Sequence, residues 1–537
     1  MSQATAPVSA PGIGSKRAGE SERISHQEAL AWVEEALFKA RQRCPELPVF
    51  AIRWMFIKHP LHPVLKSLMR EAGWSGGAEE DSLQSNRGMV WRTLRCLLYG
   101  LQLSGRLWAL RFKMRHELYD LKIRRFDLIA KTCRFGTQQA PEGSDFYYGE
   151  LQKKATERGK RMLLLCSDVK DIDWTQFVEA QFSGGPMAVL PEWCLVHPFA
   201  PIRMALRQIS ASQKLRRLSQ QARVPLEKEI FLLASRDCLL PDTAVNALNF
   251  WIAKGVVKTW RPKAFMTFYE GHAWERCAWW GARTADPSCK IIGYQHTAVF
   301  EASRSVTQPA VQGKERSLPD LVLCLGKGPA ELMRGGLEPK GVKLIPVGSF
   351  RYQGAHSAGS ADPGRRTVLV APEGIRSEVK AIFSFALACA QEIPSYTFVL
   401  RCHPEIPMPD ALKLVSEDLS RQPNIVFSEG KSLEEDCDRS SVLLSRGSST
   451  VLYGILKGLM PVYGPVNNSM PDWDPLYKFR LWRAECETPR EMAHALEAHE
   501  QAPKERREAE WEQALRYVQD YTGPVTDERM EAILNEI

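Results

Sequence analysis

The hydrophobic pattern changes character along the chain. From about residue 24 to residue 135, apolar residues recur three and four positions apart, the spacing of an amphipathic helix. From about residue 161, short apolar runs alternate with helical stretches, which is typical of βαβ units around a parallel sheet. We therefore expect a flexible tail at residues 1–22, a helical extension at residues 23–150 and α/β structure after it.

The short apolar runs form two series. The first predicts strands at Met162–Cys166, Ala264–Tyr269, Lys290–Tyr294, Asp320–Leu325 and Lys343–Val347, and the second at Thr367–Ala371, Thr397–Arg401, Asn424–Phe427, Val442–Ser445 and Pro461–Tyr463. Between the two series, HSAGSADPGRR at residues 356–366 has the composition of a linker. The predicted fold class is α/β, with two Rossmann-type parallel-sheet domains at residues 151–355 and 365–490 and C-terminal helices at residues 491–537.

Composition narrows the class of protein. Of the 537 residues, 44% are hydrophobic and 25% are charged, which argues against intrinsic disorder and against a polytopic membrane protein. The thirteen cysteines include no C-x-x-C pair and no cluster at zinc-ligand spacing, so we expect free thiols. Because the first residues also lack the apolar segment of a secretory signal, we expect a cytoplasmic protein.

Positive charge is concentrated in one region. The chain has 71 Lys and Arg against 63 Asp and Glu, and between Arg87 and Arg125 ten residues are basic and two acidic. The apolar run Leu94–Phe112 inside this region is interrupted by arginines, which suits either a helix on an anionic membrane surface or a core helix with snorkelling arginines. A nucleic-acid-binding protein is the non-enzyme alternative, although no recognition motif accompanies the charge.

Signatures of several common enzyme classes are missing. The sequence contains no G-x-x-x-x-G-K-[ST], no G-x-G-x-x-G after a predicted strand and no H-E-x-x-H, and its G-x-S-x-G at residues 73–77 follows no predicted strand. P-loop NTPases, dinucleotide-dependent oxidoreductases, zincins and α/β-hydrolases are therefore disfavoured.

In the first predicted domain, polar residues follow two strands at the edge where open parallel sheets bind ligands. Glu270 and Gly271 come directly after the strand Ala264–Tyr269, and His296 comes shortly after Lys290–Tyr294. Glu270 is a candidate general base or nucleophile, and His296 a candidate acid or base. The alternatives are a helix-capping acid and a structural histidine.

In the second predicted domain, three strands are followed by residues suited to a phosphate group. Arginine and histidine side chains neutralise phosphate, and hydroxyls with free backbone N–H groups at a helix start form a cradle without lysine or metal. Plain N-capping and turn formation are the alternatives. The candidate nucleotide-sugar ligands are Glu373, Gly374, Arg376, Arg401, His403, Pro404, Ser445, Ser448, Ser449 and Thr450, together with Gly271 of the first domain.

The order of these motifs resembles that of bacterial sialyltransferases and polysialyltransferases, which have an acidic-Gly element followed by His-Pro and Ser-Ser/Thr elements. Here these elements would be Glu270-Gly271, His403-Pro404 and Ser448-Ser449-Thr450. A longer stretch, which contains YEGHAWERCAWWGAR, IIGYQHTAVF, PDLVLCLGKGPAELMRGG and VGSFRY, resembles a family of bacterial surface carbohydrate biosynthesis proteins. That family is similar to GT-B glycosyltransferases.

The resemblance implies a metal-independent GT-B glycosyltransferase of surface-polysaccharide biosynthesis, such as that of lipopolysaccharide or capsule. It would need no cofactor and would transfer a sugar from a CMP-activated nonulosonate or Kdo to a glycan or glycolipid acceptor, in the cytoplasm or at the inner face of the cell membrane. Glu270 in the acceptor-side domain would act on the acceptor hydroxyl, and the second domain would bind the nucleotide. A UDP- or GDP-sugar donor and a CDP-polyol phosphotransferase are the alternatives.

Overall fold

The computed structural model describes most of the chain: residues 26–44, 68–69, 72, 88–113, 115, 124–134, 145–168, 188–299, 303–307, 316–350, 359–404, 406–415, 419–465, 474–476, 479 and 482–537. The predicted tail at residues 1–22 lies outside these ranges. The chain divides into two compact units, one within residues 1–106 and 197–248, and the other within residues 107–196 and 249–537.

The larger unit contains a seven-stranded sheet in the order β3-β2-β1-β4-β5-β6-β7, and every neighbouring pair is parallel. The strand order reverses between β1 and β4, as in a Rossmann-type sheet. The strands are β1 (Leu128–Arg134), β2 (Met162–Asp168), β3 (Ala188–Pro191), β4 (Ala264–Phe268), β5 (Lys290–Tyr294), β6 (Leu321–Cys324) and β7 (Lys343–Pro346).

The same unit contains a second parallel sheet of six strands in the order β10-β9-β8-β11-β12-β13. Renumbered from β8, this is again the Rossmann order, with its reversal between β8 and β11. The strands are β8 (Thr367–Val370), β9 (Thr397–Leu400), β10 (Ile425–Phe427), β11 (Val442–Ser445), β12 (Met460–Tyr463) and β13 (Ala484–Glu485). The predicted α/β class with two Rossmann-type parallel-sheet domains is therefore confirmed.

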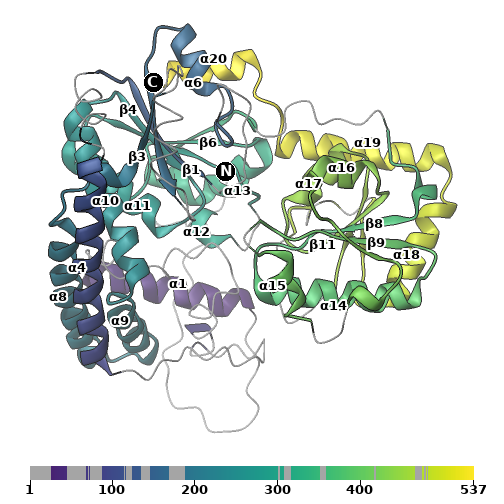
Figure 1. The fold of residues 1–537 in the computed structure, drawn as a ribbon, viewed down its shortest axis with the longest axis horizontal. Helices are drawn as coiled ribbons and strands as arrows, with labels where there is room; N and C mark the ends of the chain where they lie inside the picture. Colours follow the sequence, from purple (N-terminus) through teal and green to yellow (C-terminus); the bar gives the residue numbers. More distant parts are fainter. Residues whose placement is uncertain are drawn as a thin grey trace, which may run out of the picture. The chain divides into compact units, whose positions relative to one another are not determined.

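Helices cover both faces of the second sheet, with α14 on one side and α16 and α17 on the other (Figure 1). Because both faces are covered, strands such as β11 are buried along their whole length. The helices of the larger unit are α6 (Leu151–Glu157), α11 (Ala273–Ala285), α12 (Arg304–Thr307), α13 (Lys327–Leu337), α14 (Arg376–Glu392), α15 (Met408–Leu412), α16 (Leu433–Asp438), α17 (Thr450–Leu456), α18 (Pro489–Gln501), α19 (Lys504–Tyr521) and α20 (Asp527–Asn535).

All ten predicted strands are present, and three further strands, β1, β3 and β13, were not predicted. The most consequential is β1, an inner strand of the first sheet at the reversal point, because it lies inside the segment predicted as a helical extension. Its sequence LIAKTCR breaks the apolar run with Lys131. In the fold this lysine is buried, and its Nζ lies 2.7 Å from Oε2 of the equally buried Glu192. The apolar pattern did not predict β1 because the charge of Lys131 is neutralised by Glu192, a residue distant in sequence.

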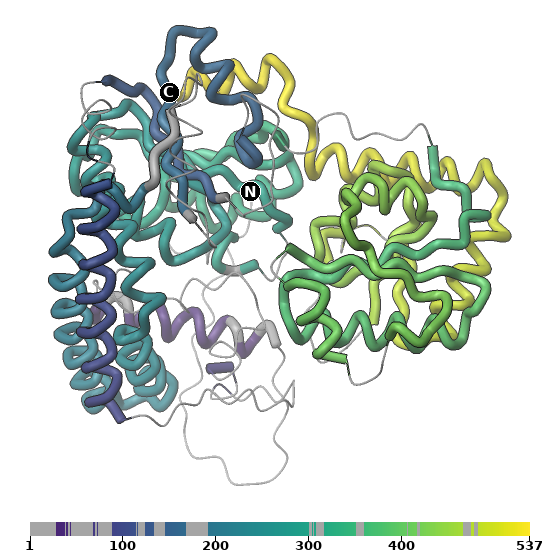
Figure 2. Tube along the Cα trace, in the orientation of Figure 1, coloured from purple at the N-terminus to yellow at the C-terminus, as the bar shows by residue number. Residues whose placement is uncertain are grey.

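The smaller unit is helical. It contains α1 (His26–Arg43), α8 (Ala200–Gln221) and α9 (Pro225–Asp237), together with the larger part of α4 (Met89–Lys113) and the first part of α10 (Pro241–Trp260). The tube in Figure 2 traces α4, α8 and α9 side by side. Helices α8 and α9 lie between β3 and β4 in sequence, inside the segment predicted as the first α/β domain. Among the described residues, no helix is long and apolar enough to cross a membrane.

Candidate functional site

Glu270 lies at the carboxyl edge of the first sheet, two residues after the end of β4 and next to the point where the strand order reverses. Its carboxylate lies between two histidines: Oε2 is 3.0 Å from Nε2 of His272, and Oε1 is 3.3 Å from Nε2 of His296. The structure thus brings the two predicted catalytic residues together. It adds His272, which stands two residues after Glu270 and was given no role from the sequence.

A tight turn directs the Glu270 side chain toward the histidines. Gly271 has a φ of +85°, and a Cβ there would lie 2.4 Å from Oγ of Ser305 in α12, so the turn needs glycine. The carboxylate of Glu275, in the first turn of α11, accepts backbone N–H groups from Glu270, Gly271 and His272 at 3.0–3.2 Å. Glu275 therefore fills the capping role that was the alternative for Glu270.

The two imidazoles differ in environment. His296 is buried, with 4% of its side chain exposed, whereas the His272 side chain is 42% exposed and that of Glu270 13%. Aromatic rings surround His296: its ring centroid lies 4.6 Å from that of Phe268 and 4.9 Å from that of Tyr147. A carboxylate with one buried and one exposed imidazole is suited to accepting and relaying a proton.

Burial also shapes the titration of neighbouring groups. Burial raises the pKa of Glu275 to about 7; the charge of Glu270 acts in the same direction, while His272 and the donated N–H groups oppose it. Burial likewise raises the pKa of the Cys133 thiol, near the end of β1, to about 12, with Lys131 opposing and the charges of Glu192 and Glu270 adding to the effect. The end of β1 therefore lies within electrostatic reach of Glu270.

At the second sheet, candidate residues follow β8, which borders the reversal point, and its neighbour β9. Gly374 follows β8 and lies directly against His403, which follows β9; a Cβ at Gly374 would be 2.6 Å from the His403 Nδ1. The neighbouring Glu373 is half-buried, whereas Pro404 and Arg376, the first residue of α14, are exposed. The fold therefore brings two of the predicted motifs together.

The Ser-Ser-Thr motif follows β11. Ser445 is the buried last residue of the strand, and Ser449 precedes the first residue of α17. The Ser448 Oγ donates to the Thr450 Oγ1 at 3.0 Å and accepts the Thr450 backbone N–H at 3.3 Å. The Ser448 hydroxyl thus accepts one backbone N–H at the start of α17, whereas the N-cap residue Ser449 makes no side-chain cap; contact of these hydroxyls with a phosphate remains a prediction.

Arg446, inside this motif, is buried, and its Nε lies 3.4 Å from Oε2 of the equally buried Glu378 in the first turn of α14. This pair links the β11 loop to the helix that follows β8. The sequence predicts no role for either residue, because a Glu in a first helical turn is ordinary.

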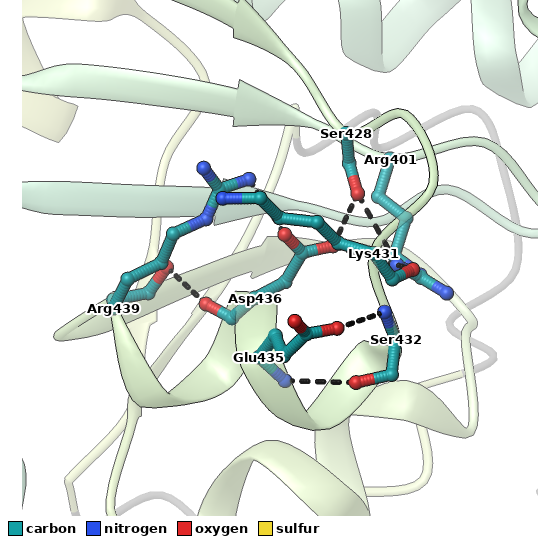
Figure 3. Close-up of polar contacts among 8 residues, drawn as sticks. Arg401, Ser428, Lys431, Ser432, Glu435, Asp436 and Arg439 are labelled. Atoms are coloured by element: carbon teal, nitrogen blue, oxygen red, sulfur yellow. Dashed lines mark hydrogen bonds and ion pairs between the residues drawn. The ribbon is translucent and has the colours of Figure 1, made fainter.

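Arg401 has an internal acidic partner (Figure 3). Its Nη1 lies 2.6 Å from Oδ2 of the fully buried Asp436, and it donates to the Ser428 Oγ at 3.2 Å and to the Lys431 carbonyl at 3.0 Å. The Ser428 Oγ also donates to Asp436, and the Arg439 Nη2 lies 2.6 Å from its Oδ1. The contacts described for Arg401 thus stabilise the loops after β9 and β10, and its contact with a phosphate remains a prediction.

Possible metal ligands and the cysteines were the two kinds of side chain considered in the sequence for metal binding or disulfides. Within the described ranges, no group of three or more His, Cys, Asp or Glu side chains is arranged to hold a metal ion. The thirteen cysteines all lie within these ranges and form no disulfide, and eleven of them are buried.

Comparison with known proteins gives no family. No protein-family model matches the sequence, and no curated protein matches it. Solved structures similar to this chain include the trehalose 6-phosphate synthase of Burkholderia multivorans, with 11% identity, coverage of 77% of this chain and 97% of that one, and a TM-score of 0.44. The UDP-GlcNAc 2-epimerase of Neisseria meningitidis bound to UDP-GlcNAc is also similar, with 9% identity, coverage of 76% of this chain and 98% of that one, and a TM-score of 0.42. A calicheamicin glycosyltransferase has 14% identity, coverage of 77% of this chain and 98% of that one, and a TM-score of 0.42. Similarity at this level assigns no activity, and the two-domain fold rests on the strand orders.

Proposed function

We propose that the protein is a GT-B-type glycosyltransferase that takes its sugar from a nucleotide-activated donor. The observation that carries the proposal is the position of Glu270, whose carboxylate contacts two imidazoles beside the reversal point of the first Rossmann-type sheet. Ligands of open α/β sheets bind at the carboxyl ends of strands at such a point. A carboxylate with adjacent imidazoles there supplies the base or nucleophile that glycosyl transfer needs.

In an inverting reaction, Glu270 would accept the proton of the acceptor hydroxyl while the new glycosidic C–O bond forms. The bond between the sugar and the donor phosphate breaks, and its electron pair leaves with the nucleotide. In a retaining reaction, Glu270 would instead attack the anomeric carbon as the bond to the donor phosphate breaks. The acceptor oxygen would then displace Glu270 from that carbon and give its proton to His272. His296 would stabilise and orient the carboxylate from its buried side, and His272 would exchange its proton with solvent.

The nucleotide would bind at the second sheet. His403 beside Gly374, together with the hydroxyls of Ser448, Ser449 and Thr450, would stabilise the negative charge that develops on the departing phosphate. Glu373, Arg376, Pro404 and Ser445 would surround the same edge, and Arg401 would either join them or keep its contact with Asp436. No step needs a metal ion or another cofactor.

We propose a CMP-activated nonulosonate or Kdo as donor and a bacterial surface glycan or glycolipid as acceptor. The support for CMP is the resemblance of the acidic-Gly, His-Pro and Ser-Ser/Thr motifs, while a UDP- or GDP-sugar donor and a CDP-polyol donor remain the alternatives. The contact with an anionic membrane predicted for Arg87–Arg125 would be made by α4. This contact does not depend on which donor the protein uses.

Calorimetric titration with CMP, CDP, UMP, UDP and GDP, with and without magnesium, tests the donor. Selective binding of CMP without magnesium is expected. Preference for UDP or GDP would overturn the CMP-sugar donor while leaving glycosyl transfer open, preference for CDP would favour the polyol phosphotransferase, and the absence of any nucleotide binding would overturn the enzyme proposal.

His403→Ala is expected to weaken nucleotide binding by about tenfold or more, because a charge-assisted hydrogen bond to phosphate is lost. His494→Ala, which removes an exposed histidine of α18, is the matched control. Equal affinities of the His403 variant and the wild type would remove His403 from the nucleotide site.

A further inference from the structure

Helix α4 exposes an apolar stripe along one face. Its large apolar residues recur three, four or seven positions apart, so they share one face of the helix. Their side chains are strongly exposed: Trp91 43%, Leu94, Leu98, Leu101 and Trp108 55% each, and Phe112 69%. Over its 25 residues the helix is about 38 Å long. Isolated exposed apolar residues are ordinary, but a stripe of this length marks an interaction surface.

The stripe is not the face by which α4 packs in the protein. The opposite face buries Cys96, Leu103 and Leu107. On that face, Gly100 approaches α8 so closely that a Cβ there would lie 3.0 Å from the Ala205 Cβ. The helix therefore has two apolar faces, one used for folding and one exposed to solvent.

Basic residues accompany the stripe. Helix α4 contains five Arg and Lys residues and no Asp or Glu. Arg95 and Arg106 are about three turns apart, and Lys113 is about two turns further, so these three side chains form a line beside the stripe. The adjacent α8 also contains five basic residues and no acidic one. In contrast, Arg111 lies on the packed side and donates to the Val196 carbonyl at 3.3 Å.

We propose that this face of α4 binds the surface of an anionic membrane, with the helix lying in the plane of the membrane. The stripe, with Trp91 and Trp108 toward its two ends, would enter the region between head groups and acyl chains, and the flanking basic side chains would contact lipid phosphates. This arrangement would hold the protein beside lipid-linked substrates, but the inference rests on α4 alone and stands whether or not the proposed donor is correct.

The charge argues against a second copy of the chain as the occupant of this face. In a symmetric pair of α4 helices, the lines of Arg95, Arg106 and Lys113 would flank a common seam without an acidic residue of α4 to pair with. An anionic lipid surface supplies the missing negative charge.

The test is co-sedimentation of the full-length protein with vesicles of phosphatidylcholine alone and with an equal mixture of phosphatidylcholine and phosphatidylglycerol, at low and high salt. We expect binding to the anionic vesicles only, and weaker binding at high salt because surface charges are screened. Failure to bind anionic vesicles, or equal binding to both kinds, would overturn the proposal.

Two variants of α4 separate its apolar and basic contributions. Leu98→Gln with Leu101→Gln retains the charge, and Arg95→Gln with Arg106→Gln retains the stripe; each pair is expected to lower the partition coefficient by about tenfold or more. The matched control, Arg506→Gln with Arg516→Gln, removes the same charge from exposed positions of α19 and should bind like the wild type.

Circular dichroism and thermal melting establish that each variant is folded. If both α4 variants bind as the wild type does, α4 is not the binding face and the proposal fails. Light scattering provides a further check: a concentration-dependent dimer that is lost in the Leu98 and Leu101 variant, without vesicle binding, would assign the face to a second copy.

Discussion

Glu270 shares its two carboxylate oxygens between a buried and an exposed imidazole, at 3.3 and 3.0 Å. The second acid at this turn, Glu275, accepts the backbone N–H groups of the turn, so the two carboxylates have separate tasks. At the scale of single residues, this division predicts that Glu270 affects chemistry and Glu275 affects folding.

Glu270→Gln is expected to lower turnover by about two to four orders of magnitude, because an amide cannot accept the acceptor proton. Nucleotide affinity should change little, since the proposed nucleotide contacts lie on the second sheet. Steady-state kinetics together with calorimetry measure both quantities, and Glu331→Gln, an exposed position of α13, is the control. Unchanged turnover would exclude Glu270 from the mechanism.

The raised pKa of Glu275 predicts how its contribution to stability depends on pH. In the folded protein the carboxyl keeps its proton up to about pH 7, whereas its ordinary pKa is 4.5. Between these values the unfolded chain binds fewer protons, so the free energy of unfolding falls as pH rises through this window, by up to about 3 kcal/mol. Thermal midpoints of wild type and Glu275→Gln across this window measure the effect.

The difference in midpoint between wild type and Glu275→Gln should shift in favour of the variant as pH rises. Glu331→Gln again serves as the control and should follow the wild type. A difference that does not change with pH would show that Glu275 does not titrate in this window.

At the scale of elements, α16 is fixed to the sheet by one buried carboxylate. Asp436 contacts Arg401 after β9, Ser428 after β10 and Arg439, the C-cap residue of α16 (Figure 3). Burial alone would raise the pKa of Asp436, but the hydrogen bonds from Ser428, Arg401 and Arg439 outweigh it and lower the pKa. The charged form is therefore the one that the fold stabilises.

Asp436→Asn should lower the free energy of unfolding by about 2 kcal/mol, the typical contribution of a hydrogen bond to a charged group. Asp438→Asn, on the same helix but exposed, is the matched control and should have little effect. Denaturant unfolding of both variants measures the difference. Equal stability of the two variants would show that the buried network contributes nothing net.

At the scale of the whole molecule, the C-terminal segment contacts both α/β domains of the larger unit. In α19, the Trp511 Nε1 donates to the Ile455 carbonyl of α17 at 2.9 Å. After α20, the Glu536 carboxylate lies 2.8 Å from Lys290 and 2.5 Å from Lys343, at the start of β5 and β7. Residues far from the first sheet in sequence thus complete its surface.

Leu534→Ala is expected to cost about 2–5 kcal/mol, because the side chain is almost fully buried where α20 packs. Glu528→Ala, an exposed position in the first turn of the same helix, should cost less than about 1 kcal/mol. Thermal unfolding of the full chain compares them. Equal midpoints for the two variants would show that α20 adds no packing energy to the first sheet.

The apolar runs along the chain locate the two series of strands and the residues that follow them, because a strand covered on both faces is a nearly continuous apolar run. The apolar pattern did not predict β1, because this strand contains Lys131, whose charge is neutralised in the fold by Glu192, a residue distant in the chain. Likewise, local pattern showed that the Leu94–Phe112 region is an apolar helix with basic residues, but not which of its faces would be buried.

Which of the candidate side chains contact one another depends on the tertiary fold. Glu270 and His296 lie together because β4 and β5 are neighbours in the sheet, and Gly374 lies against His403 because β8 and β9 are neighbours. The same pairing of elements gave Arg401 its partner Asp436 and gave Glu275 the capping role that Glu270 was a candidate for. Strand order depends on packing between segments distant in sequence, so no local pattern of residues encodes these contacts.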